Sequence, residues 1–335
     1  MERKLASVVT IDDIAPIPGA DMIEVATVKG WKLVIKKNEF KAGDPAVYCE
    51  IDSFLPVVPA FEFLRKSSYR RMGDSEGFRL KTIKLRGQVS QGLLLPVALL
   101  NGYAYTLGED VTMQLGISKY EPPIPASLAG IMKGSFPSFI PKTDEERIQN
   151  LSDQYDHYKS HAYYVTEKLD GSSVTYYYRD GGFGVCSRNL ELTETTDNTL
   201  WKVARQLDIE NKLASLDKNI ALQGEMIGEG IQGNTYDLRG QAIYFYNAFD
   251  IDTFEYLSMA EFVELINNLG LKHVPVLDIS FQLPDTIDQL LTLAEGVSIL
   301  SPANRKTERE GLVIRSTDRR ISFKVISNKF LLNED

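Results

Sequence analysis

The chain has 335 residues, of which 43% are hydrophobic and 25% charged, and its formal net charge at pH 7 is −9. This length suits two domains, and the composition excludes collagen-like and extensively disordered proteins. No segment approaches the roughly 20 apolar residues of a membrane span, and the first residues lack the apolar core of a signal peptide, so we expect a soluble, intracellular protein.

Short β-like segments separated by turns fill the first 120 residues. They include IEVATVKGWKLVIKK, FKAGDPAVYCEIDSFLP and FRLKTIKLRGQVSQGLLLP, in which runs of apolar and β-branched residues are interrupted by Gly, Pro and Asp. Several short strands within about 100 residues suit a small closed barrel better than a sandwich. We therefore predict an OB-like β-barrel over residues 1–120.

A basic run lies inside this first domain, from Leu64 to Arg86, and contains eight Lys and Arg residues and two acids. Residues 1–120 as a whole carry 16 cations against 14 acids, whereas the rest of the chain carries 21 against 32. A run of this kind is either a solvated basic face or a phosphate-binding surface. For a nucleic-acid enzyme the second interpretation is favoured, and Arg79, Lys81 and Arg86 become the candidate RNA-binding residues.

Residues 121–142 are rich in proline, which disfavours long regular structure, and we interpret them as a linker. Thr143 and Glu146 have the spacing of a capping box, which predicts that a helix starts there. Residues 143–335 then alternate helical and strand patterns, which indicates an α+β domain with mostly antiparallel sheets. We expect helices over 195–213, 258–269 and 285–295, and strands over 163–169, 172–178, 219–226, 242–251, 310–316 and 320–326.

Several common site motifs are missing or lack the necessary context. Gly228–Gly233 matches GxGxxG but is followed by turn residues rather than a helix, and no P-loop motif occurs. His157 and His161 have helical spacing without an acidic partner, which favours a solvent-facing pair over a metal site. Cys49 and Cys186 indicate neither a disulfide framework nor a zinc site, and we expect both in cores.

The segment VTEKLDGSSVTYYY, residues 165–178, places a lysine between two acids at the end of a predicted strand. Residues two apart in a strand share a face, so Lys168 and Asp170 point the same way, while Gly171 permits a sharp turn or a close ligand. Taken alone, this pattern favours a surface ion pair.

Other short motifs change that interpretation because they follow one another in a particular order. They are EKLDGSS (167–173), SRN (187–189), QGEMIGEG (223–230), FYNAFDI (245–251), EGLVIR (310–315) and SFKVISNKFL (322–331). Together they resemble the ordered motifs of covalent nucleotidyltransferases, which comprise ATP-dependent DNA and RNA ligases and mRNA capping enzymes. Because the barrel-like domain comes first, with RGQVSQGLLLP inside it and ERIQN after it, the chain resembles the fifth RNA ligase family, which has an amino-terminal OB domain.

The resemblance implies roles for five charged residues. Lys168 is expected to attack the α-phosphorus of ATP and to form a lysyl-AMP phosphoramidate. Asp170, Glu225 and Glu310 are expected to hold a largely hydrated Mg²⁺, or Mn²⁺, which depresses the pKa of that lysine and binds the α-phosphate. Glu225 also accepts the ribose hydroxyls in this scheme, and Lys324 adds positive charge over the α-phosphate.

Further nucleotide contacts follow from the same resemblance. Tyr246 is expected to stack on adenine, with its neighbour Phe245 as the alternative. Arg147 and Arg188 are suited to gripping phosphates of ATP or RNA. The last motif has one secure lysine where RNA ligases often have two, and Lys329 is a weak substitute for the second.

The function expected from this resemblance is that of an ATP-dependent RNA ligase. It joins 5′-phosphate and 3′-hydroxyl RNA ends, at nicks in duplex RNA, through lysyl-AMP and adenylylated RNA. Two alternatives stay open: an mRNA capping guanylyltransferase, which the lack of an OB-like segment after the last motif disfavours, and an inactive OB-containing RNA-binding protein. We expect a monomer that binds ATP, a divalent cation and RNA but no membrane.

Overall fold

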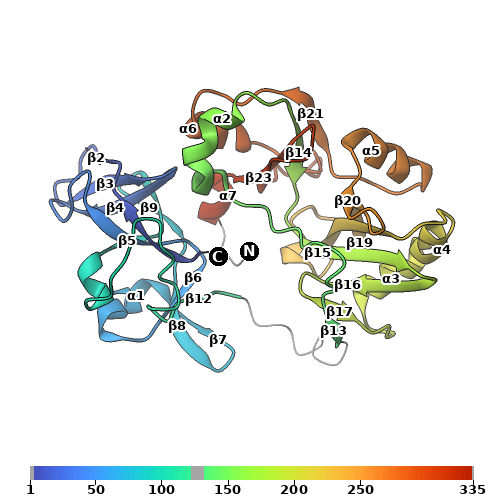
Figure 1. Ribbon diagram of the computed structural model, residues 1–335, viewed down its shortest axis with the longest axis horizontal. Coiled ribbons are helices and arrows are strands. Elements are labelled where there is room, and N and C mark those ends of the chain that lie inside the picture. The colour runs from blue at the N-terminus through green and yellow to red at the C-terminus, as the bar shows by residue number, and fades with distance from the viewer. Residues whose placement is uncertain (1–3, 122–131, 334–335) are drawn as a thin grey trace. The chain divides into compact units, whose positions relative to one another are not determined.

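The computed structural model describes residues 4–121 and 132–333 and divides the chain into two compact units (Figure 1). Unit 1 comprises Met1–Pro123, Gln149–Asp153 and Leu331–Asp335, and unit 2 comprises Ile124–Ile148 and Gln154–Phe330. Each unit has its own hydrophobic core. No helix in the described ranges is both long and apolar enough to cross a membrane.

Unit 1 consists almost entirely of short antiparallel strands. They form four small sheets with the strand orders β1-β5-β11, β12-β6-β8-β7, β2-β3-β4 and β9-β10. The strands are β1 (Ala6–Thr10), β2 (Asp13–Pro16), β3 (Ile23–Val28), β4 (Trp31–Lys36), β5 (Pro45–Cys49), β6 (Ser53–Pro56), β7 (Tyr69–Met72), β8 (Ser75–Arg79), β9 (Thr82–Leu85), β10 (Gln88–Gln91), β11 (Leu93–Pro96) and β12 (Ser118–Lys119). The helix α1 (Arg65–Ser68) and the 3-10 helices Pro59–Leu64 and Val97–Leu100 also belong to this unit.

Strand β4 illustrates how the sequence specifies this unit. In WKLVIK the apolar residues Trp31, Leu33 and Ile35 are buried while the residues between them are partly exposed, as expected when one strand face covers a core. The Trp31 indole donates a hydrogen bond of 2.7 Å to Asn150, which belongs to the same unit although it lies far along the chain. Cys49 is a buried free thiol in this core, as the sequence predicts.

Unit 2 contains two antiparallel sheets, of seven strands (β13-β17-β16-β15-β18-β19-β20) and four strands (β21-β14-β22-β23). The strands are β13 (Met132–Ser135), β14 (Tyr163–Lys168), β15 (Ser172–Arg179), β16 (Gly182–Cys186), β17 (Leu190–Leu192), β18 (Ile220–Gly228), β19 (Gln241–Asp250), β20 (Glu255–Tyr256), β21 (Val276–Phe281), β22 (Gly311–Ser316) and β23 (Ser322–Ile326). The helices are α2 (Tyr155–Tyr158), α3 (Thr199–Gln206), α4 (Ile209–Ala214), α5 (Met259–Asn268), α6 (Ile287–Ala294) and α7 (Asn328–Asn333), which runs into unit 1, with a 3-10 helix at Gln232–Asn234. A further 3-10 helix, Ile148–Gln154, lies mostly in unit 1. The predicted α+β class with mostly antiparallel sheets is confirmed.

Helices α3, α4 and α5 pack on one face of the seven-stranded sheet (Figure 1). The core between them includes Phe245 from the sheet and Trp201 from α3. Helix α5 begins as the sequence predicts, because Ser258 and Glu261 cap it reciprocally, and Gly270 follows its end with a φ of 64° that a glycine adopts without strain. The opposite face of the sheet is left for the polar residues of the site.

Two predictions for the region between the domains need correction. Part of the predicted linker, residues 122–131, lies outside the described residues, but Met132–Ser135 form β13 at the edge of the seven-stranded sheet. Thr143 and Glu146 do not open a helix: residues 143–146 have no regular secondary structure, and helical structure starts at Ile148. The polar groups of this segment form hydrogen bonds with residues far along the chain, and these contacts override the local capping signal.

Candidate active site

Lys168 and Asp170 stand where the four-stranded sheet passes into the seven-stranded sheet. Lys168 is the last residue of β14, and Asp170 lies in the short connection to β15. Gly171 is required in this connection, because a Cβ atom there lies only 2.4 Å from the carbonyl oxygen of Met226. The backbone N–H of Asp170 donates to the hydroxyl of Tyr236 at 2.9 Å, which fixes the connection.

Lys168 is paired with Glu310. Strand pairing places Lys168 opposite Gly311 of β22, and Glu310, immediately before that glycine, contacts the Lys168 Nζ atom at 2.6 Å. The Lys168 side chain is 26% exposed, so its amine is accessible from solvent. Burial favours the neutral amine, but the carboxylates of Glu310, Glu225 and Asp170 outweigh burial and raise the pKa of Lys168. In this state the side chain is an ammonium.

Glu225 faces the same region from β18, where it pairs with Ser173 of β15 and Tyr244 of β19. Its carboxylate accepts no hydrogen bond from the residues that the structure describes. Burial, together with the negative charges of Glu310 and Asp170, raises the pKa of Glu225 to about 8 despite the opposing effect of Lys168. Without a further cation Glu225 is therefore mostly protonated at neutral pH, and a divalent cation beside it would favour its carboxylate form.

This donor set suits a divalent ion that keeps most of its waters. Across residues 4–121 and 132–333, no three Asp, Glu, His or Cys side chains lie close enough to be direct ligands of one metal ion. Mg²⁺ gives up its hydration shell reluctantly and is commonly held through water by a few carboxylates. Asp170, Glu225 and Glu310 therefore fit the cation as partners of its waters. The rings of His157 and His161 pack edge to face.

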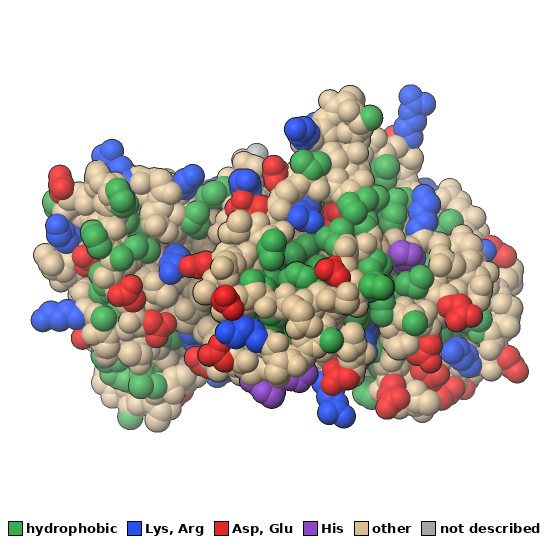
Figure 2. Space-filling model, turned by 90° about the horizontal axis from the view of Figure 1, so that it is seen from above, with side chains coloured by type: hydrophobic (Ala, Val, Ile, Leu, Met, Phe, Trp, Pro, Cys, Tyr) green, Lys and Arg blue, Asp and Glu red, His purple; other side chains and the backbone are tan. Residues whose placement is uncertain are grey.

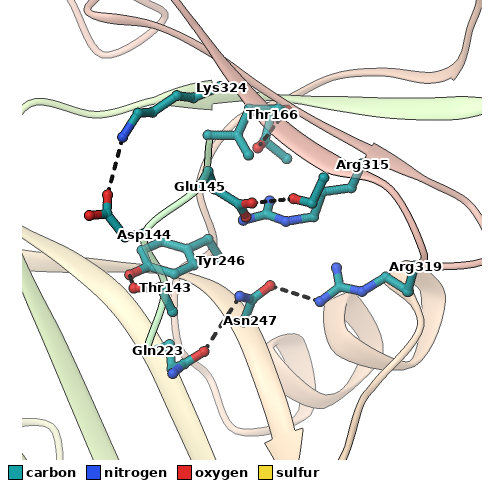
Figure 3. A network of polar contacts seen from close by, with 12 residues as sticks. Thr143, Asp144, Glu145, Thr166, Gln223, Tyr246, Asn247, Arg315, Arg319 and Lys324 are labelled. Atoms are coloured by element: carbon teal, nitrogen blue, oxygen red, sulfur yellow. Dashed lines mark hydrogen bonds and ion pairs between the residues drawn. The ribbon is translucent and has the colours of Figure 1, made fainter. Parts of the chain in front are cut away.

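Lys324 lies on β23 beside a second set of charges. Its Nζ atom contacts Asp144 at 3.2 Å (Figure 3). The same carboxylate accepts from Arg188 at 2.8 Å. Burial, with a contribution from the positive charges of Arg147 and Lys168, lowers the pKa of Lys324 to about 8, and Asp144 opposes that shift. Lys324 and Arg188, two of the predicted phosphate-binding cations, thus both contact the Asp144 carboxylate.

Arg147 is buried and runs alongside Lys324. The two residues form a parallel β-bridge, and the backbone N–H of Lys324 donates to the carbonyl of Glu146 at 2.8 Å. This position rules out a solvated helix-surface role for Arg147, because the side chain is only 7% exposed. Arg147 is therefore placed with the other candidate phosphate-binding residues.

Residues 143–146 form one wall of this network through their side chains (Figure 3). The hydroxyl groups of Thr143 and Tyr246 are 3.0 Å apart, and the Glu145 carboxylate accepts from Arg315 at 2.9 Å and from the Ser322 hydroxyl. The Arg315 side chain is 5% exposed, and its guanidinium carbon lies 6.0 Å from the centre of the Tyr246 ring. These contacts hold the segment against β19, β22 and β23.

A β-bulge settles which aromatic residue of β19 faces the site. Gln223 of β18 pairs with Asn247 and the next residue pairs with Phe245, so Tyr246 is the extra residue between them. The bulge lets Phe245 stay in the core, where it is 0% exposed, while Tyr246 and Asn247 both point to the other face. This burial of Phe245 favours Tyr246 as the residue that stacks on adenine.

The candidate RNA-binding residues of unit 1 differ in how free their charges are. Arg79 is 13% exposed, lies 3.6 Å from Asp52 and covers the ring of Tyr120, so its charge is already engaged. Lys81 is partly buried and has polar contacts of its own. Arg86 is exposed at the turn between β9 and β10. These three residues therefore differ in exposure and pairing, which the sequence alone does not reveal.

Sequence reasoning missed four residues that shape the site. Asp144 and Glu145 were interpreted as the first turn of a helix, and Arg315 was seen only as the end of a motif. Thr235 was overlooked in the turn after the glycine-rich segment, yet its hydroxyl donates to the Asp170 carboxylate at 3.0 Å. The only sequence signal for them was a cluster of acids beside a predicted catalytic domain.

Comparisons with known proteins agree with this arrangement. A family model of an OB-fold domain matches residues 5–97, and the RNA ligase family model matches residues 161–329. No curated protein sequence matched the chain.

Among solved structures, RNA ligase from Naegleria gruberi is similar to this chain over nearly its full length. A lysine-to-alanine variant with ATP and Mn is 45% identical with a TM-score of 0.93, and the match covers 99% of both chains. A glutamate-to-alanine variant with AMP and Mn is 45% identical with a TM-score of 0.92 and the same coverage. The ligase with pyrophosphate is 46% identical with a TM-score of 0.91, and the match covers 98% of both chains.

The ordered motifs converge on one site around Lys168, unit 1 matches an OB-fold model, and the family match spans the segment that carries the motifs. The resemblance inferred from the sequence is confirmed, and this chain belongs to the RNA ligase family.

Proposed function

We propose that this protein is an ATP-dependent RNA ligase that joins 5′-phosphate and 3′-hydroxyl RNA ends at nicks in duplex RNA. The observation that carries the proposal is the position of Lys168, whose Nζ atom is accessible, contacts Glu310 at 2.6 Å and is flanked by Asp170 and Glu225. The Naegleria relatives were solved with ATP, AMP and pyrophosphate, which are the substrate and products of such a reaction.

The first step is adenylylation of the enzyme. The neutral amine of Lys168 attacks the α-phosphorus of ATP, a nitrogen–phosphorus bond forms, the bond to the pyrophosphate leaving group breaks, and the amine loses a proton. Lys324, with Arg147 and Arg188, would face the negative charge that develops on the phosphates, and Tyr246 would pack on the adenine. Asp144 would have to release Lys324 and Arg188 as the phosphates enter.

The paired Lys168 is not yet a nucleophile, because the surrounding carboxylates favour its ammonium form. Asp170, Glu225 and Glu310 would hold a hydrated divalent cation through its waters, and Glu225 would also accept the ribose hydroxyls. Such a cation offsets the three negative charges, favours the neutral amine of Lys168 and neutralises charge on the α-phosphate.

Two further transfers complete the proposed reaction. The RNA 5′-phosphate attacks the phosphorus of lysyl-AMP, so that the phosphorus–nitrogen bond breaks and Lys168 is regenerated as AMP moves to the RNA. The RNA 3′-hydroxyl then attacks the activated 5′-phosphate, loses its proton and expels AMP, which leaves a phosphodiester bond. We propose that the protein acts as a monomer.

Label transfer from ATP tests the proposal directly. The native protein is incubated with α-³²P-labelled ATP and Mg²⁺ and run on a denaturing gel, with labelled GTP in parallel to test the capping alternative. Label from ATP is expected on the native protein and on a control, Lys329→Ala, whose lysine is exposed and paired with Glu295. Lys168→Ala should carry no label yet still seal a pre-adenylylated nick, because the last step does not use the amine. Labelling of Lys168→Ala would contradict the assignment.

A further inference from the structure

Three of the eight cations of the basic run in unit 1 are paired with nearby acids. Arg65 contacts Glu62 at 2.6 Å, and Arg71 contacts Glu76 at the same distance. Arg79 faces Asp52, as described above. The dense positive charge seen in the sequence therefore does not form one continuous phosphate-binding face.

Lys66, Arg70, Lys84 and Arg86 are exposed and form no ion pair with a residue that the structure describes, and the last two lie in the hairpin of β9 and β10. From residue 77 to residue 108 the sequence contains four cations and no acid. Lys84 and Arg86 are exposed at the end of this hairpin, and neither forms an ion pair with any residue that the structure describes. These two charges are available to a partner, whereas the charges of Arg65, Arg71 and Arg79 are already paired.

The base of the hairpin is firmly held. Tyr48 donates its hydroxyl hydrogen to the carbonyl of Gln91 at 3.0 Å, and the backbone N–H of Val34 donates to the Ser90 hydroxyl at 2.9 Å. Thr82, Ser90 and Gln91 are buried. The free end therefore projects from a rigid base.

The tip has both faces in solvent. Its two strands pair only with each other, and the two-residue turn has a positive φ at both Arg86 (48°) and Gly87 (85°), which is the backbone of a tight hairpin turn. Ile83 and Leu85 are 47% and 40% exposed, and they share one strand face while Lys84 lies on the other. A strand packed on a core buries one of its faces, and this strand buries neither near the turn.

We infer that this tip docks on the duplex RNA substrate, with Lys84 and Arg86 on phosphates and with Ile83 and Leu85 against the sugars of the minor groove. The inference rests on the proposed function and assigns its RNA contacts to particular residues. In A-form RNA the minor groove is wide and shallow, so a narrow two-stranded ribbon reaches the sugars, whereas the deep major groove excludes side chains.

Charge complementarity supports RNA as the partner. In unit 2 the Asp and Glu side chains gather over the part that carries α3, α4 and α5, at the right of Figure 2. That surface repels phosphates, so affinity for the duplex has to come from cations elsewhere. The contacts are to backbone and sugar, which predicts binding without sequence preference.

The test is the salt dependence of binding to a fluorescent nicked RNA duplex, measured by anisotropy with the full chain. The hairpin variant is Lys84→Gln with Arg86→Asn, since Asn tolerates a positive φ. The matched control is Arg65→Gln with Arg71→Gln, which removes the same charge from the same unit. Each lost phosphate contact flattens the slope of log K against log salt by about 0.9, so the hairpin variant should lose about 1.8 from the slope and about 60-fold in affinity near 0.1 M salt.

A second variant separates the apolar contact from the charge. Ile83→Ser with Leu85→Ser should weaken binding at every salt concentration and leave the slope unchanged. An unchanged slope in the Lys84 and Arg86 variant, or an equal change in the control, would overturn the inference. Adenylylation is measured on the same samples: if all variants become labelled from ATP but bind RNA like the native protein, the hairpin assignment alone is wrong, whereas a native protein that takes no label contradicts the proposed function.

Discussion

ATP binding is expected to draw a proton onto Lys324. In the structure this lysine sits between Asp144 and the buried Arg147, and its pKa is lowered to about 8 from the ordinary value of 10.5. Burial is the main cause, with Arg147 and Lys168 adding to it. A bound triphosphate brings negative charge next to Lys324, which favours the ammonium form and returns the pKa toward its ordinary value.

The size of this effect follows from the two pKa values. Near pH 8 the unliganded Lys324 is half protonated, so binding takes up about 0.5 proton if the bound form has its ordinary pKa. The uptake falls to about 0.1 proton one pH unit lower and rises to about 0.9 proton one unit higher. Because protons are taken up, ATP affinity must fall as the pH rises, by about sevenfold between pH 8.5 and pH 9.5.

Isothermal titration calorimetry measures this uptake directly. The native protein is titrated with α,β-methylene-ATP, which does not transfer AMP, in buffers of different ionisation enthalpy. The slope of the observed enthalpy against the buffer enthalpy is the number of protons taken up. Lys324→Met should lower the uptake at pH 8 by about 0.5 proton relative to the native protein, whereas the control Lys329→Met should keep it, because Lys329 is exposed and paired with Glu295.

Two results would refute this reasoning. One is a proton uptake in Lys324→Met equal to that of the native protein, which would show that another group takes up the proton. The other is a native protein whose nucleotide affinity does not change between about pH 8 and pH 9.5, where a lysine with a pKa near 8 has to titrate.

Two further predictions concern the metal site and the connection beside it. Alanine at Asp170, Glu225 or Glu310 should lower the rate of lysyl-AMP formation by about 100-fold or more, measured in single-turnover experiments, and near-native rates in all three variants would exclude the proposed cation site. Gly171→Ala should lower the free energy of unfolding by about 1–3 kcal/mol in urea titrations, because its new methyl group meets backbone at 2.4 Å, while Gly134→Ala, with nothing within 4 Å, should unfold like the native protein.

The sequence predicts this fold and site well where chemistry restricts the residue type. Lys168, Glu310 and Lys324 belong to motifs whose order is informative even though each motif is short, and the structure places them around one region. The pairing of β14 with β22 brings residues 168 and 311 together, which no local pattern reveals. The order of the motifs along the chain was the evidence that these residues belong to one site.

The failures arise where long-range contacts compete with a local signal. Thr143 and Glu146 match a capping box. However, the carbonyl of Glu146 accepts a hydrogen bond from the backbone of β23, and the hydroxyl of Thr143 is hydrogen-bonded with that of Tyr246, so the helix does not form there. The choice between Phe245 and Tyr246 depended on a bulge, which shifts the two-residue period by one and is not visible in composition. The charges of the basic run could not be ranked, because Asp52 lies far from Arg79 in sequence.

Three cations of the site are paired with carboxylates. Lys168 pairs with Glu310, while Lys324 and Arg188 share Asp144. Removing one partner of a partly buried charge pair leaves the other charge poorly solvated, so these carboxylates stabilise the site until phosphate or a divalent cation replaces them. The same pairing lowers the net affinity for ATP, because each incoming phosphate first has to displace a carboxylate. The same competition favours the release of pyrophosphate and later of AMP, because the carboxylates pair with their cations again as each product leaves.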